Sequence, residues 1–282
     1  MVENHPGLSA GRHLILILGV IAISLPVWLA FVASTQDPDS FLSGRASLIP
    51  GRHLFENYAL VLFRGADAAS VPPVWHMMAN SLVMALIIAA GKIAISILSA
   101  FAIVFFRFPF RTLVFWMIFV TLMLPVEVRI VPTFQVVADL GLLNSTAGLT
   151  LPVIASATAT FLFRQFFLSV PKELVEAARI DGAGPMRFFR DILLPLSRTN
   201  IAALFVVMFI YGWNQYIWPF IVTTDVTHYT VVMGIKRLIA VPDADPMWHL
   251  VMATAILAML PPVLVILAMQ RLFVKGLVDS EK

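Results

Sequence analysis

Long apolar runs alternate with shorter polar segments along this chain. The hydrocarbon core of a bilayer is roughly 30 Å thick, and about 20 apolar residues in helical form are needed to cross it. Six runs reach that length, and they predict membrane-spanning helices at about 13–34, 79–105, 113–133, 147–168, 199–222 and 250–271. We therefore expect an all-α, polytopic membrane protein with six transmembrane helices.

Prolines interrupt the apolar pattern in or near the ends of several predicted spans. They stand at Pro125, Pro132, Pro152, Pro219, Pro261 and Pro262. Proline lacks the backbone N–H that a helix uses and clashes with the preceding turn, so kinked or broken helices are expected here. Such helices are more typical of a transporter than of a rigid membrane anchor.

Lysine and arginine are unevenly divided between the two sides of the predicted bundle. Six spans put both termini on one side, and that side carries roughly twice as many of these cations as the other. Because such an excess marks the cytoplasmic face, we predict cytoplasmic termini and a cytoplasmic loop at 169–198. The polar segments 35–78 and 223–249 then form outer loops.

The composition supports the membrane class and excludes several others. The chain is 60% hydrophobic and 12% charged, with a mean hydropathy of +0.92, whereas a soluble domain is about a quarter charged. The net charge of +3 gives no reason to expect a nucleic-acid partner. The absence of cysteine excludes disulfides and thiolate metal sites.

No motif for catalysis or nucleotide binding is present. The six histidines are scattered without metal-ligand spacing. The chain contains no GxxxxGK[ST] loop, so a Walker-type ATP site is not expected in it. We also find no pairing of a nucleophile with a base. These observations predict a non-enzymatic subunit without a cofactor of its own, in which any energy source lies in a partner.

The cytoplasmic loop predicts two short helices. Pro171 fits the first position of a helix, because its fixed φ suits that place. Gly182 is a natural helix stop, for which we expect a positive φ. Pro185 can begin the second helix, and Pro195 is expected to limit it. The unit is therefore helix, glycine turn, helix, outside the bilayer.

This loop resembles the EAA loop of ATP-binding-cassette (ABC) importer permeases. The family pattern is EAA, three residues, Gly, nine residues, Ile, one residue, Leu-Pro, and the chain fills every position. In that family the loop is a coupling helix that docks into the ATPase subunit. The resemblance implies such a role for Glu176, Ala177, Ala178, Asp181, Gly182, Ile192, Leu194 and Pro195, with Glu176 as the expected ion-pair partner of the ATPase.

The resemblance extends over nearly the whole chain. MANSLVMALIIAAGKIAISILSAFAI is similar to the opening of the type-1 permease core, and six spans match the smaller, maltose-permease-like subunit of carbohydrate-type importers. This implies a type-1 ABC importer permease fold in a bacterial inner membrane. The implied parts are 1–77 (a first helix with an outer loop), 78–271 (the transmembrane domain) and 272–282 (a cytoplasmic tail).

Within that group, FIYGWNQYIWP and GLVDSEK look most like permeases of glycerol-3-phosphate importers. The resemblance implies sn-glycerol-3-phosphate, or related glycerophosphodiesters, as cargo. The implied partners are a second related permease, a dimer of the ATPase that binds ATP and Mg²⁺, and a periplasmic binding protein. The alternatives are a sibling importer for a sugar or sugar alcohol and a self-powered secondary carrier.

Five polar residues in or near the spans are candidates for the translocation path or a gate: Lys92, Glu127, Arg129, Asn214 and Gln215. An intramembrane cation is costly and suggests a function, so Lys92 is a candidate contact for an anionic substrate; snorkelling is the alternative. The charged pair near the end of the third span is expected at an outer gate or simply at the interface. Arg129 is also a candidate contact for a phosphate, because arginine suits phosphate geometry. The two amides need partners, in the path or on the second permease.

Overall fold

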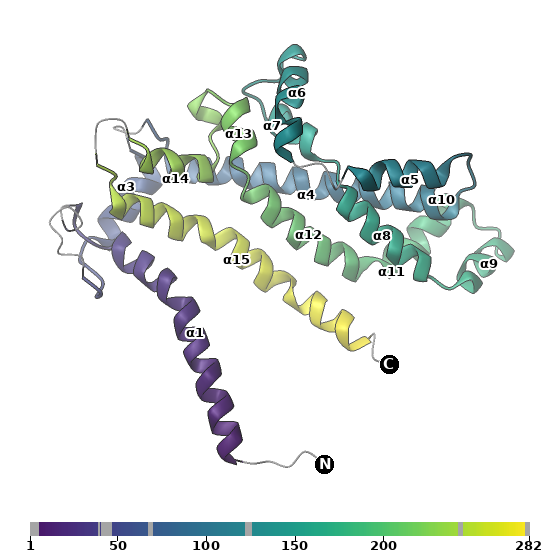
Figure 1. The fold of residues 1–282 in the computed structure, drawn as a ribbon, viewed down its shortest axis with the longest axis horizontal. Helices are drawn as coiled ribbons and strands as arrows, with labels where there is room; N and C mark the ends of the chain where they lie inside the picture. Colours follow the sequence, from purple (N-terminus) through teal and green to yellow (C-terminus); the bar gives the residue numbers. More distant parts are fainter. Residues whose placement is uncertain are drawn as a thin grey trace. The chain divides into compact units, whose positions relative to one another are not determined.

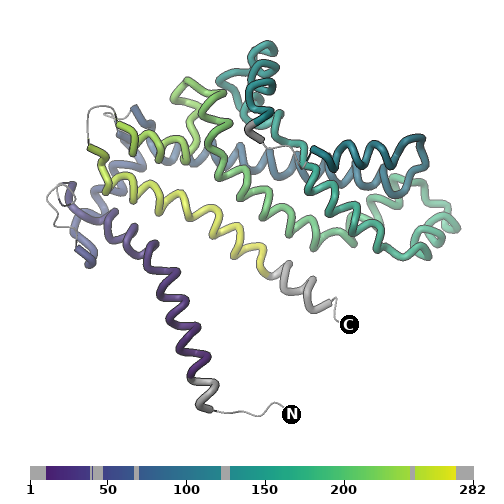
Figure 2. Tube along the Cα trace, in the orientation of Figure 1, coloured from purple at the N-terminus to yellow at the C-terminus, as the bar shows by residue number. Residues whose placement is uncertain are grey.

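The structure is a computed structural model that describes residues 6–38, 40, 47–66, 70–121, 126–241 and 245–279, with side chains given for all of these except 6–10, 126–127 and 271–279 (Figure 2). Apart from one isolated antiparallel bridge between Ala66 and Val71, the described residues form helices and connecting turns. The expected all-α class is confirmed.

Three helices within the described ranges are long and apolar enough to cross a bilayer. They are α1 (Pro6–Ser34), α4 (Val74–Phe105) and α15 (Trp248–Asp279). Two bent helix pairs raise this number to five if each pair is counted as one span. α15 remains one helix through Pro261 and Pro262, so these prolines do not break it as expected. The count of six continuous spans is not reproduced.

The expected third span at 113–133 is divided between two helices. α5 (Arg111–Val120) has ten residues and α6 (Val126–Asp139) has fourteen, and residues 122–125 lie outside the described ranges. At 1.5 Å per residue, neither helix alone reaches across roughly 30 Å of hydrocarbon. Pro132 lies inside α6 without ending it.

The expected fourth span at 147–168 is broken near Pro152. The helical residues run through α7 (Thr146–Thr150) and the short 3₁₀ turn η2 (Leu151–Val153), and α8 (Ala157–Ser169) follows after a bend of 47°. The Ser156 hydroxyl caps α8 by accepting from the backbone N–H of Ala159. Here the proline broke the helix as predicted.

The expected fifth span at 199–222 is also divided. α12 (Arg198–Trp213) stops at residues 214–216, and α13 (Ile217–Val222) follows. The expected outer segments 35–78 and 223–249 contain short helices as well, namely α3 (Leu54–Phe63) and α14 (Val231–Ile239).

The chain divides into two compact units. One comprises Met1–Met77 with Met233–Leu260, and the other comprises Met78–Val232 with Pro261–Lys282. In the first unit, the buried amide of Asn57 donates to the backbone carbonyls of Ser34 and Gln36, which ties α3 to the end of α1. All candidate site residues fall in the second unit.

The core of the second unit joins α4 to the broken helices. Its buried members are Met84, Ile88, Val137, Leu149, Trp218 and Val222. Gly212 of α12 lies so close to α4 that an added Cβ would sit 2.9 Å from the Cα of Ala85. Any larger residue at position 212 would therefore push α12 away from α4. This contact fixes the two helices that carry the central side chains described below (Figure 1).

Candidate functional site

The first helix of the 169–198 loop, α9 (Lys172–Ile180), ends in the glycine turn that the sequence predicts. Gly182 has a φ of +71°. Its N–H donates to the carbonyl of Arg179 at 3.1 Å, and the N–H of Ala183 donates to the carbonyl of Ala178 at 2.8 Å. These two bonds form a Schellman motif, which satisfies the free carbonyls at a helix end. Pro171 differs slightly from expectation, because it is the N-cap and not the first helical residue.

α9 has one inward and one outward side. Ala178 is buried and lines a cavity of ≈ 160 Å³ together with Phe101, Phe105 and Phe188. In contrast, Glu176, Ala177, Asp181 and Gly182 are exposed. A small residue on the inner side lets α9 approach the end of α4, and the acidic side chains remain available on the outer side.

The second helix of the loop ends at Leu196, one residue beyond the predicted limit at Pro195. α10 (Pro185–Phe188) continues through a π-helical segment, η3 (Phe189–Leu193), into α11 (Leu194–Leu196). Proline offers no N–H to the carbonyl four residues earlier, and a wider turn at that point accommodates this loss. Ile192 and Leu194 are half-buried and Pro195 is exposed within this run.

The run ends in a sharp bend at Ser197. The helix pair Pro185–Leu196 and Arg198–Trp213 is bent by 72°. Ser197 is fully buried, and both its hydroxyl and its N–H donate to the carbonyl of Leu193, at 2.6 and 3.0 Å. The bend redirects the chain from the helices of the 169–198 loop into α12, and the apolar pattern alone did not indicate it.

An aromatic cluster joins the loop helices to α4 and α8. The ring of Phe189 lies 4.9 Å from that of Phe101, and Phe188 lies 5.4 Å from Phe105. Phe105 also contacts Phe167 of α8 at 5.9 Å. Packed aromatic rings resist independent movement because interiors are close-packed. A displacement of the loop helices is therefore expected to move the end of α4.

A second cavity, of ≈ 520 Å³, meets the middle of α4 at Lys92. We call it the basic cavity, and its lining residues are Lys92, Arg129, Ile130, Thr133, Pro152, Val153, Ala155, Tyr211, Asn214, Gln215, Tyr216, Ile217 and Trp218. Both helix breaks, at 154–156 and at 214–216, contribute to its wall. Non-helical backbone at membrane depth is tolerated where it lines a cavity or is buried in protein. The breaks and the cavity therefore belong to one feature.

Lys92 is the central cation of the basic cavity. Its side chain is only 7% exposed, and Nζ lies 4.1 Å from the centroid of the Tyr211 ring. A cation over an aromatic face is attracted by the ring quadrupole. Among the side chains that the structure describes, no carboxylate forms an ion pair with Lys92. The snorkelling alternative is not supported by this position, because the ammonium meets Tyr211 within the cavity.

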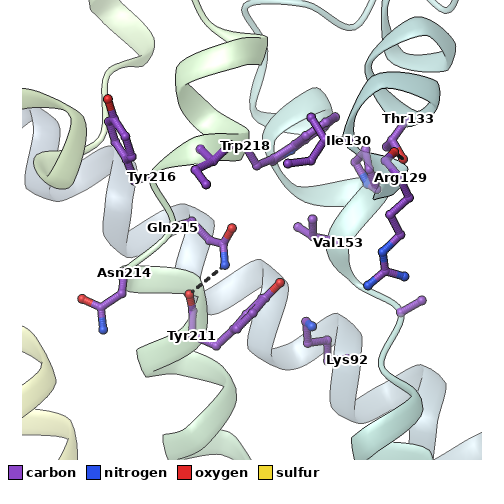
Figure 3. A pocket seen from close by; sticks show the side chains of 13 residues that line it. Lys92, Arg129, Ile130, Thr133, Val153, Tyr211, Asn214, Gln215, Tyr216 and Trp218 are labelled. Carbon is purple, nitrogen blue, oxygen red and sulfur yellow. Dashed lines mark hydrogen bonds between the residues drawn. The ribbon is translucent and has the colours of Figure 1, made fainter. Parts of the chain in front are cut away.

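The structure brings Arg129 to the same cavity and separates the two amides. In Figure 3 the guanidinium of Arg129 extends from α6 toward the side of Lys92. Gln215 points inward, and its amide donates to the carbonyl of Tyr211 at 3.2 Å, which caps the end of α12. Asn214 is exposed, and its amide is turned away from Lys92. The side chain of Glu127 lies outside the described ones.

Sequence reasoning missed several residues of these sites. Tyr211 was not singled out, although it lies three and four residues before the two amides and thus on a neighbouring helix face. The rings of Phe101 and Phe105 were missed because they look like ordinary apolar span residues. Only the packing of α4 against the loop helices identifies them.

Comparisons with known proteins agree with this architecture. The family described as binding-protein-dependent transport system inner membrane component matches residues 92–279. The chain is 59% identical to the sn-glycerol-3-phosphate transport system permease protein UgpE of Salmonella typhi, and 58% identical to those of Agrobacterium fabrum and Escherichia coli O157:H7. Each comparison covers 100% of both chains.

A solved structure shares the fold. It is a chain from the crystal structure of a bacterial ABC transporter involved in the import of the acidic polysaccharide alginate. The TM-score is 0.80 at 21% sequence identity, covering 96% of this chain and 99% of the other. At this identity the likeness shows the fold alone. The expected permease fold is therefore confirmed.

Proposed function

We propose, from the premise that the chain belongs to the family of binding-protein-dependent transport system inner membrane components, that it is a permease subunit that imports sn-glycerol-3-phosphate. The observation that supports this substrate is the identity of 57–59% to UgpE proteins over the full length of both chains. A family match over 92–279 carries the transport role. The chain is thus a multi-pass inner-membrane transport subunit.

The proposed assembly contains this chain, a second related permease, two copies of an ATPase and a periplasmic binding protein. The family description itself names dependence on a binding protein. ATP and Mg²⁺ bind to the ATPase, since the sequence of this chain has no Walker loop. Both termini and the 169–198 loop face the cytoplasm, where the ATPase lies.

The exposed side of α9 is the proposed docking surface for the ATPase. Glu176 and Asp181 offer carboxylates to basic side chains of the partner, and Ala177 allows a close approach. The opposite side, at Ala178, rests on the phenylalanines at the end of α4. Gly182, Ile192, Leu194 and Pro195 shape the turn and the second helix that support this surface.

Movement of α9 is proposed to reach the translocation path through α4. α4 contacts the loop helices through Phe101 and Phe105, and it also places Lys92 in the basic cavity. ATP-driven closure of the ATPase dimer would shift α9, then the aromatic cluster, and then the cavity wall. Lys92, Arg129 and Gln215 line the path, with Asn214 at its margin. Glu127 is proposed at the outer gate on the basis of its sequence position.

Reconstitution of the whole assembly tests this function. The chain is placed in proteoliposomes with its second permease, ATPase and binding protein, and ATP hydrolysis and uptake of radiolabelled substrate are measured. We expect sn-glycerol-3-phosphate to stimulate both, and glycerol to stimulate neither. Stimulation by a neutral sugar alone would contradict the substrate, and uptake that needs no ATP would contradict the importer class.

A further inference from the structure

We propose that Lys92 and Arg129 form a binding site for the phosphate group of a phosphate monoester inside the basic cavity. The proposed function rests on the coupling loop and on the similarity of whole chains, and neither says where the substrate is held. The phosphate site deepens that function and depends on it, because it assigns the charged end of the cargo to two named side chains.

The two positively charged side chains of the cavity favour an anionic ligand. A cation buried in a membrane protein is costly unless it pairs with another group. Lys92, which is buried, and Arg129, which is exposed on this chain, both line the basic cavity. Among the described side chains neither forms an ion pair. Two like charges that face one space also repel each other. A dianionic phosphate entering this space relieves both the missing pairing and the repulsion.

The two cations suit a phosphate in complementary ways. Arginine presents a planar fork of donors that matches two phosphate oxygens, and lysine adds a compact point charge. They approach the cavity from different helices, Arg129 from α6 and Lys92 from α4 (Figure 3). A ligand held between them therefore bridges two elements. A relative shift of α4 and α6 would weaken this bridge and release the ligand.

The remaining lining suits the small polar body of such a monoester. The cavity volume of ≈ 520 Å³ lies within the range of about 300–1,000 Å³ that is typical of small-molecule sites. Thr133 and Gln215 line the cavity with groups that can form hydrogen bonds. The ring centroid of Tyr211 lies 4.1 Å from Nζ of Lys92, so the ring would compete with a phosphate for this ammonium. This alternative partner keeps the affinity for phosphate low enough for onward transport.

Chemical labelling of Lys92 tests the site without relying on transport. The purified complex in phosphatidylcholine nanodiscs is treated with pyridoxal 5′-phosphate, an aldehyde that carries a phosphate monoester. Its aldehyde condenses with the lysine amine and releases water, and borohydride then reduces the imine to a stable secondary amine. Mass spectrometry locates the modified lysines. Lys236, which is exposed on α14 and lies outside the lining of the basic cavity, serves as the internal control.

We expect sn-glycerol-3-phosphate to protect Lys92 but not Lys236, and glycerol to protect neither. Pyridoxal, which lacks the phosphate, should label Lys92 less. Arg129→Gln should raise the concentration for half-protection by roughly tenfold, because it removes a charge-assisted contact. Arg111→Gln, at an exposed position of α5 outside the cavity, should leave that concentration unchanged. A protection curve that Arg129→Gln does not move would overturn the assignment.

A lipid phosphate is the other source of the same chemistry, so the labelling is repeated with phosphatidylglycerol in the nanodiscs. Protection by this lipid together with none by sn-glycerol-3-phosphate would overturn the assignment to the cargo. The outcome is separable from that of the proposed function. If the wild-type complex imports sn-glycerol-3-phosphate while Lys92 is not protected, the phosphate site fails and the function stands. If no import occurs, the proposed function itself fails.

Discussion

The loop helices and the basic cavity use charge in opposite ways. On α9 the carboxylates of Glu176 and Asp181 are exposed, whereas Lys92 of the cavity is 7% exposed. Exposed charges are hydrated and cost little, so they are suited to a partner that docks from water. A buried cation must find a partner within the protein or in a ligand. The first region therefore fits a protein surface, and the second fits a small anion.

The two regions also differ in how they connect to α4. The loop helices contact its end through aromatic rings, and the cavity is built around its middle. A variant at the junction should disconnect the regions, whereas a variant within one region should impair only that region's task. The following predictions separate these effects, from the largest expected change to the smallest.

Phe105→Ala should have the largest effect, because it removes the ring that contacts both Phe188 and Phe167. Phe105 is half-buried, so its truncation should cost less than the about 3–5 kcal/mol that is typical of a fully buried phenylalanine. A loss of about 2 kcal/mol in coupling would lower uptake per ATP hydrolysed by roughly 30-fold. The measurement is the ratio of uptake to hydrolysis in proteoliposomes. Phe110→Ala, at a ring that is 76% exposed, is the control. An unchanged ratio in Phe105→Ala would argue against transmission through the cluster.

Gly182→Val should impair docking of the ATPase. An added side chain meets open space there, so the penalty comes from the φ of +71° alone. This strain is about 1–2 kcal/mol or more for a branched residue, and we expect stimulated ATP hydrolysis and uptake to fall together, by roughly tenfold. Gly184→Val is the matched control, because Gly184 is equally open and has a φ of −68°. Equal loss in both variants would contradict a specific role for the turn.

Lys92→Gln should separate transport from hydrolysis in the opposite region. Loss of a charge-assisted contact with phosphate is expected to lower uptake by roughly tenfold. Stimulated ATP hydrolysis should stay within about twofold of wild type, because the substitution leaves the α9 surface unaltered. Initial rates of both are measured on the same vesicles. A parallel loss of hydrolysis and uptake would indicate a structural role for Lys92 instead.

Tyr211→Leu should have the smallest effect on phosphate binding. Tyr211→Phe keeps the aromatic ring, so it should behave like the wild type. A cation over an aromatic face contributes about 0.5–2 kcal/mol. Loss of this contact should therefore raise the affinity of Lys92 for phosphate by a few-fold. We expect Tyr211→Leu to bind the phosphate probe more tightly and to release it more slowly. The measurement is the concentration of sn-glycerol-3-phosphate that half-protects Lys92 from labelling. Equal behaviour of the Leu and Phe variants would exclude a role for the ring.

The sequence predicted the loop better than the cavity, and the physical reason is the range of the interactions. A helix, a stop at Gly182 and a positive φ follow from local backbone preferences, which a short segment contains. The π-helical segment before Pro195 was missed, because local preferences do not indicate it and two of its residues, Phe189 and Leu193, are buried in tertiary packing. The broken third span was missed because hydropathy measures apolar length and not helix continuity.

The cavity was predictable only in part. Lys92 stood out because a cation in an apolar run is unusual at any fold. The sequence made Arg129 a candidate for the same path, but its place in the same cavity as Lys92 depends on helices that are distant in sequence. No local signal identified Tyr211. Likewise, the side chain of Gln215 points inward and that of Asn214 points outward because of where α12 ends. Such positions are set by tertiary packing.

The most direct test of the central claim asks whether ATP changes the cavity through the aromatic cluster. The chain has no cysteine, so Thr133→Cys introduces one reporter thiol in the lining of the cavity. Its labelling rate by a membrane-impermeant maleimide is measured with and without ATP and vanadate, in this variant alone and together with Phe105→Ala. The account predicts an ATP-dependent change in rate that Phe105→Ala abolishes. A change of the same size in both backgrounds would contradict it.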